Sequence, residues 1–368
     1  GKLKNVPFHS EEILFKKHNG MITSSPFTIN LGLGTLHSEI KNFLNFENYS
    51  LNLIASQIDL IELKKIFQFQ DRINGEMNGE FHLRYLNGQP TLLADIKFKD
   101  GNFDDILFEN LKIEAIFREN RLTLSEVDIN TDIGLLNFSG WLTNTGENFS
   151  FLESDLLNIS GEFDKFELSY LMRYFPWEQK TTGLLSGKIN IKGKASSPRI
   201  ELKPRVENPL FDKIIGENLS GTLIYTNERL HFKPLKLETT SGQYTCTGSI
   251  PASISFVKMV DLNIMEQPLD FIFTGKSNSL EFLIPYIAPI DSLNGEFAMQ
   301  LELLGTLKNP IIGGQISIQD AKLELLHLDN TLESLTGIAT ISSNKLIIKK
   351  LSGSLFQVEE DKGLIASV

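Results

Sequence analysis

Residues 110–124, NLKIEAIFRENRLTL, decide the fold class of this chain. Leu111, Ile113, Ala115 and Phe117 occupy every second position, with Lys112 and Glu114 between the first three, a Glu-Asn pair follows, and the alternation then resumes. A period of two places every second side chain on the same face of an extended strand. A short polar break between two such runs is typical of a hairpin. The stretch therefore predicts two antiparallel strands, each with one apolar face and one solvated face.

The same alternation continues through most of the 368 residues and predicts a mainly β chain. No linker rich in proline or serine interrupts it, so we expect one elongated, curled antiparallel sheet with a continuous apolar face. The residues predicted to line this face are Phe81, Leu83, Ile96, Phe98, Ile113, Phe117, Leu122, Leu124, Phe138, Ile189, Ile191, Ile200, Leu202, Leu223, Tyr225, Leu230, Phe232, Tyr244, Leu301, Leu303, Ile316, Ile318, Ile341, Leu346 and Ile348.

Landmark residues recur at a constant offset of 108, which indicates an internal repeat. They are Gly75, Gly79, Pro90, Asn110-Leu111, Arg121-Leu122, Gly134 and Gly140, followed by Gly183, Gly187, Pro198, Asn218-Leu219, Arg229-Leu230, Gly242 and Gly248. A third copy follows at offsets of 112 to 116, which places a four-residue insertion between Pro310 and Leu335. We expect the tail of a preceding copy over residues 1–55, full repeats over 56–163 and 164–275, and an incomplete repeat over 276–368.

One segment in each copy has apolar residues at helical spacing instead. These segments are Ile58–Phe69, Phe166–Trp177 and Leu280–Ile287. In the first, Leu60 and Leu63 share a face that Lys64 does not. Each repeat is therefore predicted to combine about six strands with one short amphipathic helix.

Charge and composition exclude several classes of protein. The chain has 46 acidic and 35 basic residues, a net charge of −11, and no cluster of basic residues, so we expect no nucleic-acid partner. No apolar run approaches the roughly 20 residues that a membrane-spanning helix needs. Cys246 is the single cysteine, which excludes an intramolecular disulfide and a cysteine-based zinc site. The chain begins at Gly1 without an apolar leader, and we interpret it as a piece of a longer protein.

Motifs for catalysis or cofactor binding are missing. The six histidines show neither HxxH nor HExxH spacing, and the glycine pair at Gly313-Gly314 lacks the Lys-Ser/Thr of a phosphate loop. Adjacent carboxylates such as Asp104-Asp105 fit a solvated surface better than a site. We therefore expect no catalytic residues, no metal, no cofactor and no enzymatic activity.

The ordered set of motifs resembles the AsmA-like superfamily and, within it, the TamB-like (translocation and assembly module, DUF490) repeat proteins. The order is a short amphipathic helix, spaced glycines and a proline, an Asn-Leu pair, a basic residue followed by leucine, and two further glycines. The residues that carry the resemblance are Gly183, Gly193, Pro198, Gly295, Gly305 and Pro310, then Asn218-Leu219-Ser220-Gly221 and Leu335-Thr336-Gly337, then Gly242 and Gly248.

This resemblance implies a periplasmic β-groove that bridges inner and outer membranes and shields phospholipid acyl chains, in support of outer-membrane biogenesis. It also implies an inner-membrane anchor outside this sequence and an outer-membrane β-barrel partner reached through other regions. The pattern alone leaves a second interpretation open, because alternating apolar faces normally close against another sheet. That alternative is a structural or adhesive β-repeat rod with a closed core and no ligand.

Overall fold

The computed structural model describes most of the chain, and the account below is confined to that part. The described residues are 2–3, 6–10, 12–19, 21–45, 48–67, 73–86, 89–103, 106–143, 156–171, 180–212, 214–252, 254, 268–279, 290–306, 308–325, 330–357 and 364–367. They form almost only antiparallel strands, with two short helices, which confirms the predicted mainly β class. The chain divides into two compact units, the first of residues 1–166 and 188–196 and the second of residues 167–187 and 197–368. Each unit is described by itself.

The first unit holds α1 and the strands up to β13. Their bounds are β1 Lys2–Leu3, β2 Val6–Ser10, β3 Phe15–His18, β4 Met21–Ser24, β5 Phe27–Leu31, β6 Gly34–Asn45, β7 Asn48–Asp59, α1 Leu60–Phe67, β8 Ile73–Leu86, β9 Gln89–Phe103, β10 Ile106–Arg118, β11 Arg121–Thr131, β12 Gly134–Thr143 and β13 Leu156–Glu167. From β5 to β13 each strand pairs antiparallel with the next one in the chain.

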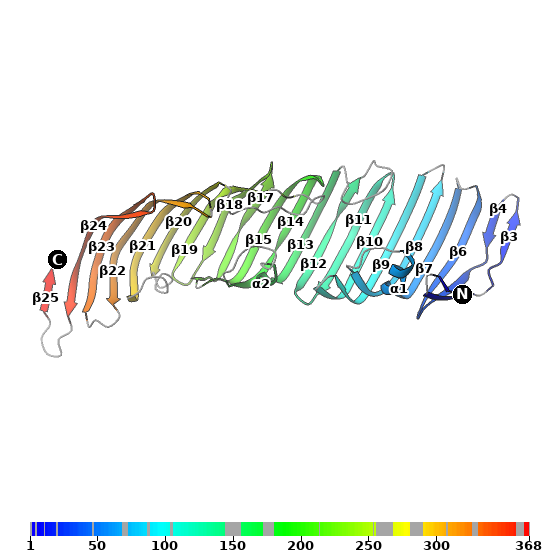
Figure 1. Ribbon diagram of the computed structural model, residues 1–368, viewed down its shortest axis with the longest axis horizontal. Coiled ribbons are helices and arrows are strands. Elements are labelled where there is room, and N and C mark those ends of the chain that lie inside the picture. Colours follow the sequence, from blue (N-terminus) through cyan, green and yellow to red (C-terminus); the bar gives the residue numbers. More distant parts are fainter. Residues whose placement is uncertain are drawn as a thin grey trace. The chain divides into compact units, whose positions relative to one another are not determined.

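The second unit repeats this arrangement. Its elements are α2 Leu168–Leu171, β14 Thr181–Lys194 (whose last seven residues belong to the first unit), β15 Ser197–Phe211, β16 Ile214–Ile215, β17 Asn218–Thr226, β18 Arg229–Glu238, β19 Gly242–Pro251, β20 Leu269–Ser279, β21 Ile290–Gly305, β22 Pro310–Leu325, β23 Asn330–Ser342, β24 Lys345–Gln357 and β25 Leu364–Ser367. Figure 1 shows the strands of each unit lying side by side in chain order. In the described part of either unit, no ladder joins the first strand to the last, so each sheet is open.

The offset of 108 found in the sequence also relates the strand bounds. Adding 108 to the bounds of β8, β9 and β12 gives the bounds of β14, β15 and β19, respectively. Residues with positive φ recur at the repeat offsets. Asp100 and Asn208, 108 residues apart, have φ of 46° and 49°, and Asp320, 112 residues after Asn208, has φ of 50°. Asx side chains tolerate this left-handed conformation better than most residues. The repeat is therefore a repeat of backbone conformation as well as of hydrophobic pattern.

Hairpin turns of one type recur once in each copy. Glu119 and Asn120 both have positive φ, as do the pairs at 227–228 and 343–344. Two consecutive residues with positive φ define a type I′ turn, whose twist matches that of the flanking strands. The turns set the register of β10 with β11, of β17 with β18 and of β23 with β24.

The helix α1 begins two residues later than the predicted segment Ile58–Phe69; its last described residue is Phe67, and residues 68–69 lie outside the described residues. It begins where it does because the Asp59 carboxylate accepts a hydrogen bond from the backbone N–H of Ile61 at 2.8 Å, as an N-cap does. In the predicted helix Phe166–Trp177, the first two residues instead end β13, residues 168–171 form α2, and residues 172–177 lie outside the described residues. The predicted helix Leu280–Ile287 also lies outside them.

A buried core forms where α1 packs on β2, β7 and β8 (Figure 1). Ile58 has no exposed surface, Leu60 is 5% exposed, and both belong to a cluster with Val6 and Leu31. Lys64 on the same helix is nearly buried, and its Nζ donates to Asn74 Oδ1 at 2.6 Å. The helix thus covers one end of the sheet in the first unit.

Candidate functional site: the apolar sheet face

Cross-strand rows of apolar side chains run over one face of the first unit. The strand registers place eight residues in a single row from β6 to β13. They are Leu36, Ala55, Gly79, Ile96, Ile113, Val127, Phe138 and Gly161. Neighbouring rows contain Phe81 with Ala94 and Leu83 with Leu92 on one side of it, and Met77 with Phe98 on the other. Because side chains two residues apart share a face, these rows form one apolar surface.

Most of this surface is only half-buried. Phe81, Ile96, Ile113 and Phe138 each keep part of their area exposed, whereas their chain neighbours on the opposite face are mainly exposed polar residues. In the described part of the first unit, the main packing contacts join only ladder neighbours, apart from those of α1. No second sheet therefore covers this face among the described residues.

The registers place all nine predicted lining residues from β8 to β12 on this one face. They are Phe81, Leu83, Ile96, Phe98, Ile113, Phe117, Leu122, Leu124 and Phe138. Phe98 is the exception in exposure, because it is 8% exposed and belongs to the buried core near α1. Ile189 and Ile191 lie on β14 and are half-buried.

The second unit has a corresponding face. Rows join Leu202, Leu223 and Phe232, and further along Met299, Ile316, Ala339 and Ile348. The predicted lining residues on these strands share the face: Ile200, Leu202, Leu223, Tyr225, Leu230, Phe232, Tyr244, Leu301, Leu303, Ile316, Ile318, Ile341, Leu346 and Ile348. Leu346 and Ile348 are the most exposed of them, at 60% and 61%.

Tyr225 has a structural role that the sequence did not indicate. It is 4% exposed, and its hydroxyl accepts a hydrogen bond from the backbone N–H of Ile254 at 2.9 Å. The hydroxyl also lies 3.2 Å from the carbonyl oxygen of Ile254, to which it donates. The side chain therefore fixes the segment after β19 and offers little surface to a ligand.

Small residues complete the rows and were missing from the predicted set. Gly79, Ala94 and Ala115 occupy row positions between larger apolar residues. A Cβ added to Gly79 would lie 3.0 Å from the backbone oxygen of Asp95, so a larger side chain would be crowded there. Their signal in the sequence is their even spacing from the large apolar residue of the same strand (Phe81, Phe98 and Phe117), which a search for large side chains overlooks.

The opposite face of the first unit carries paired charges. Lys112 Nζ lies 2.7 Å from Glu114 Oε1 and 2.5 Å from Glu126 Oε2. Hydrogen bonds to Glu114 and then Glu126 raise the pKa of Lys112 above its ordinary value. Lys188 pairs with Glu162 at 2.6 Å on the same face. The opposite face therefore carries ion pairs, together with exposed apolar side chains such as Ile54, Leu93 and Ile116.

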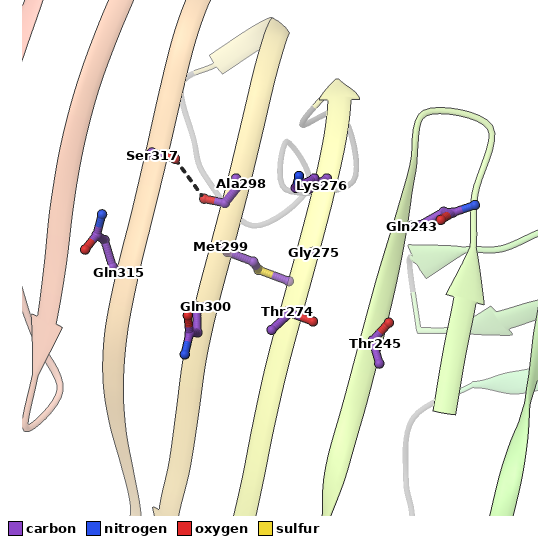
Figure 2. Close-up of a pocket in the computed structure, with 10 residues that line it drawn as sticks. All are labelled: Gln243, Thr245, Thr274, Gly275, Lys276, Ala298, Met299, Gln300, Gln315 and Ser317. Carbon is purple, nitrogen blue, oxygen red and sulfur yellow. Dashed lines mark hydrogen bonds between the residues drawn. The ribbon is translucent and has the colours of Figure 1, made fainter. Parts of the chain in front are cut away.

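The opposite face of the second unit has a polar, nearly uncharged region on β19 to β22. A shallow hollow of about 520 Å³ lies there, and Figure 2 shows the side chains around it. Lys276 is the one charged residue of its lining, which otherwise consists of Gln243, Thr245, Thr274, Gly275, Ala298, Met299, Gln300, Gln315 and Ser317. No sequence motif pointed to this hollow.

Cys246 offers a chemical probe of the apolar face, since it pairs in register with Phe273. Burial raises the pKa of its thiol to about 11. Only the thiolate reacts with alkylating agents, so at pH 8 we expect iodoacetamide to modify the folded protein roughly 100-fold more slowly than the urea-unfolded chain. The rate should rise with pH until the thiol ionises near its raised pKa. A folded-state rate equal to the unfolded rate would show that the thiol is fully hydrated. Mass spectrometry of the alkylated protein measures both rates.

Within the described ranges, no group of three His, Cys, Asp or Glu side chains is placed to hold a metal ion. No described helix has the length and apolar character needed to cross a membrane. Comparisons with protein-family models, with curated proteins and with solved structures gave no match in any of the three. The apolar face is therefore the feature from which a function has to be argued.

Proposed function

We propose that the apolar face of each unit shields the acyl chains of phospholipids during their transfer between two membranes, without chemical change. The observation that supports this most is the half-buried apolar surface that continues from strand to strand in each unit. Soluble proteins rarely leave contiguous apolar patches of this kind exposed unless a partner or a ligand covers them.

The energetics fit a lipid. Moving a two-chain phospholipid into water exposes about 30 methylene groups at roughly 0.8 kcal/mol each, a barrier near 25 kcal/mol. A wall of Leu, Ile, Val and Phe side chains offers the tails an environment close to hydrocarbon. Because successive strands present similar side chains, no single position binds the tails much more tightly than the next one. Function on this proposal belongs to a surface and requires no catalytic residue.

The setting in the cell follows from the resemblance and is part of the same proposal. We place the protein in the periplasm, anchored at the inner membrane by a part of the protein outside this sequence, and acting in outer-membrane biogenesis. Regions of the protein outside this sequence would also bind an outer-membrane β-barrel partner. The open face of each unit supports the lipid proposal over the rod with a closed core, because a closed core requires a second layer over the same side chains.

Purification without detergent tests the proposal. We expect more than one phospholipid per chain in organic extracts, because each unit offers an apolar surface many strands wide. Quantitative lipid mass spectrometry against protein amino-acid analysis gives the ratio. The delipidated protein should take up added dioleoyl phosphatidylglycerol again. Protein that carries no lipid and takes up none would contradict the proposal and favour the rod.

A further inference from the structure

The two ends of the apolar face in the first unit are closed to different degrees. The helix end is the one at which β7 leads into α1, and the far end is the one at which β8 turns into β9 and β10 into β11. At the helix end, one cross-strand row consists of Ile58, Met77, Phe98 and Leu111. These four side chains are between 0% and 9% exposed and share a buried cluster with Leu60 of α1. The protein's own side chains therefore fill the helix end.

The same face is open at the far end of β8 to β11. The cross-strand row at that end contains four half-buried residues, Leu83, Leu92, Phe117 and Leu122. The row continues on β12 and β13 to Leu142 and Leu157, which are only 1% and 2% exposed, so the opening is confined to the earlier strands. A ligand that lies along β8 and β9 thus meets a filled core at one end and partly exposed side chains at the other.

Two stacked tyrosines border the face at this open end. Tyr49 is the second residue of β7, Tyr85 is the last but one of β8, and the two are paired in the ladder. Their ring centres lie 5.2 Å apart, and the ring planes differ by 14°. Tyr85 continues the alternation of Phe81 and Leu83, which places both tyrosines on the apolar face. We call Tyr49 and Tyr85 the tyrosine pair.

Tyrosine is suited to a border between hydrocarbon and water. Its ring is apolar, and its hydroxyl can donate and accept hydrogen bonds. Tyrosines accordingly gather at the two interfaces of a bilayer, at the depth of the headgroups. Both members of the tyrosine pair are half-buried, and among the described residues the Tyr85 hydroxyl has no hydrogen-bond partner. The phosphate and ester oxygens of a phospholipid are acceptors that it can use.

The length of the open face fits one acyl chain. Gly79 lies in the row next to the filled one, and Tyr85 is six residues further along β8. Six residues of a strand span about 20 Å. The chains of one lipid occupy half of the hydrocarbon core of a bilayer, about 15 Å. A chain whose methyl end lies against the filled row therefore has its ester end near the tyrosine pair.

We propose that phospholipids on the first unit lie along β8 and β9 with their chain ends toward α1 and with their glycerol and phosphate groups at the tyrosine pair. This inference rests on the proposed function, because it gives a direction to the lipid that this function requires. The filled row leaves no room for a headgroup at the helix end of these strands. The tyrosine pair offers the headgroup hydrogen bonds at the far end.

Tryptophan fluorescence with labelled lipids measures this direction. Trp141→Phe and Trp177→Phe remove the two tryptophans of the full chain. On that background, Leu92→Trp places a reporter beside the tyrosine pair. Ile96→Trp places one four residues closer to the helix end, about 13 Å away. The delipidated protein is loaded with phosphatidylcholine that carries a nitroxide quencher either on the headgroup or near the methyl end of one chain.

The two reporters should respond in opposite order. We expect the headgroup label to quench the fluorescence of Leu92→Trp at least about twofold more than the chain-end label does, and the reverse for Ile96→Trp, because of their separation along the strand. Leu122→Trp lies in the row of Leu92 and repeats the measurement on β11, which also serves if Leu92→Trp does not fold. Circular dichroism checks the folding of each variant.

Leu93→Trp is the matched control for Leu92→Trp. Leu93 is the same residue type at the next position of β9, but it lies on the opposite face and is 42% exposed. Both labels should quench this variant weakly and to the same extent, because the sheet separates its side chain from the lipid.

Removing the two hydroxyl groups tests the part of the tyrosine pair. Tyr49→Phe combined with Tyr85→Phe keeps both rings on the apolar face, so the amount of bound lipid should be unchanged. The headgroup loses its hydrogen bonds at the border, and the preference for the headgroup label at Leu92→Trp should fall from about twofold to near equality.

The outcomes separate this inference from the function on which it rests. Equal quenching by the two labels at both reporters, or quenching in the reverse order, would overturn the direction while the apolar face still binds lipid. A double phenylalanine variant that keeps the full preference would overturn the role of the tyrosine pair. If the protein takes up no labelled lipid at all, both proposals fail.

Discussion

Aspartate in place of Ile113 is expected to stop lipids from passing the first unit while the unit stays folded. Ile113 lies in the middle of the apolar row, between Ile96 and Val127, and is half-buried. Without lipid, water can hydrate the new carboxylate, so we expect a loss of stability of about 1–2 kcal/mol and a melting temperature about 3–6 °C lower. With lipid, each acyl chain must pass a charge, which costs several kcal/mol. We expect lipid transfer between donor and acceptor vesicles to fall at least tenfold.

Ile116→Asp is the matched control for this variant. It changes the same residue type on the same strand, but Ile116 is on the opposite face and 39% exposed. Its lipid transfer should equal that of the wild type. A contradicting result is that Ile113→Asp melts far below the parent while the folded remainder still carries the normal amount of lipid. Ile113 would then belong to a closed core, and the proposal of an open, lipid-binding face would be wrong.

Aspartate in place of Ile58 should have the opposite outcome and unfold the first unit. Ile58 is fully buried, opposite Met77 in the ladder and in one cluster with Leu60. A carboxylate there would replace an apolar side chain inside a buried apolar cluster, so its burial costs several kcal/mol, a large part of the stability of a domain. We expect the first unit to show no cooperative unfolding transition. Thermal scans monitored by circular dichroism measure this.

Ile58→Val separates the effect of charge from that of volume. Removing one methyl group from a buried site costs about 0.5–1.5 kcal/mol, so this variant should fold and transfer lipid normally. A cooperative transition at the wild-type temperature for Ile58→Asp would show that α1 does not cover this position in solution. The aspartate variants at Ile58 and Ile113 thus distinguish a residue that stabilises the fold from one that contacts the lipid.

The sequence predicted the strands well because the information lies in short stretches. Alternation around Ile113 and Phe138 placed these residues on one face, and the registers agree. The 108-residue offset, found from glycines and prolines, also relates the bounds of β8 to those of β14. Period-two patterns and turn residues are local signals, so no knowledge of tertiary contacts was needed.

The exposure of individual residues could not be predicted in this way. Phe98 and Phe81 have the same pattern on neighbouring strands, yet Phe98 is buried and Phe81 is half-buried. The difference depends on the core near α1, which includes residues distant in the chain such as Val6. The long cross-strand rows depend on distant residues in the same way. Leu36 and Phe138 come into one row only through the registers of the strands between them.

The pairing of nearly every strand with its neighbour in the chain has a consequence for how the protein folds. From β5 to β13, each ladder closes a short connection, so the entropy lost at each step is small. Contact order is low for a β protein, and low contact order favours fast folding. A chain delivered from its N-terminus can add each strand to the edge of those already paired, as linear repeat proteins do. Length then adds steps to assembly without requiring any strand to wait for a distant partner.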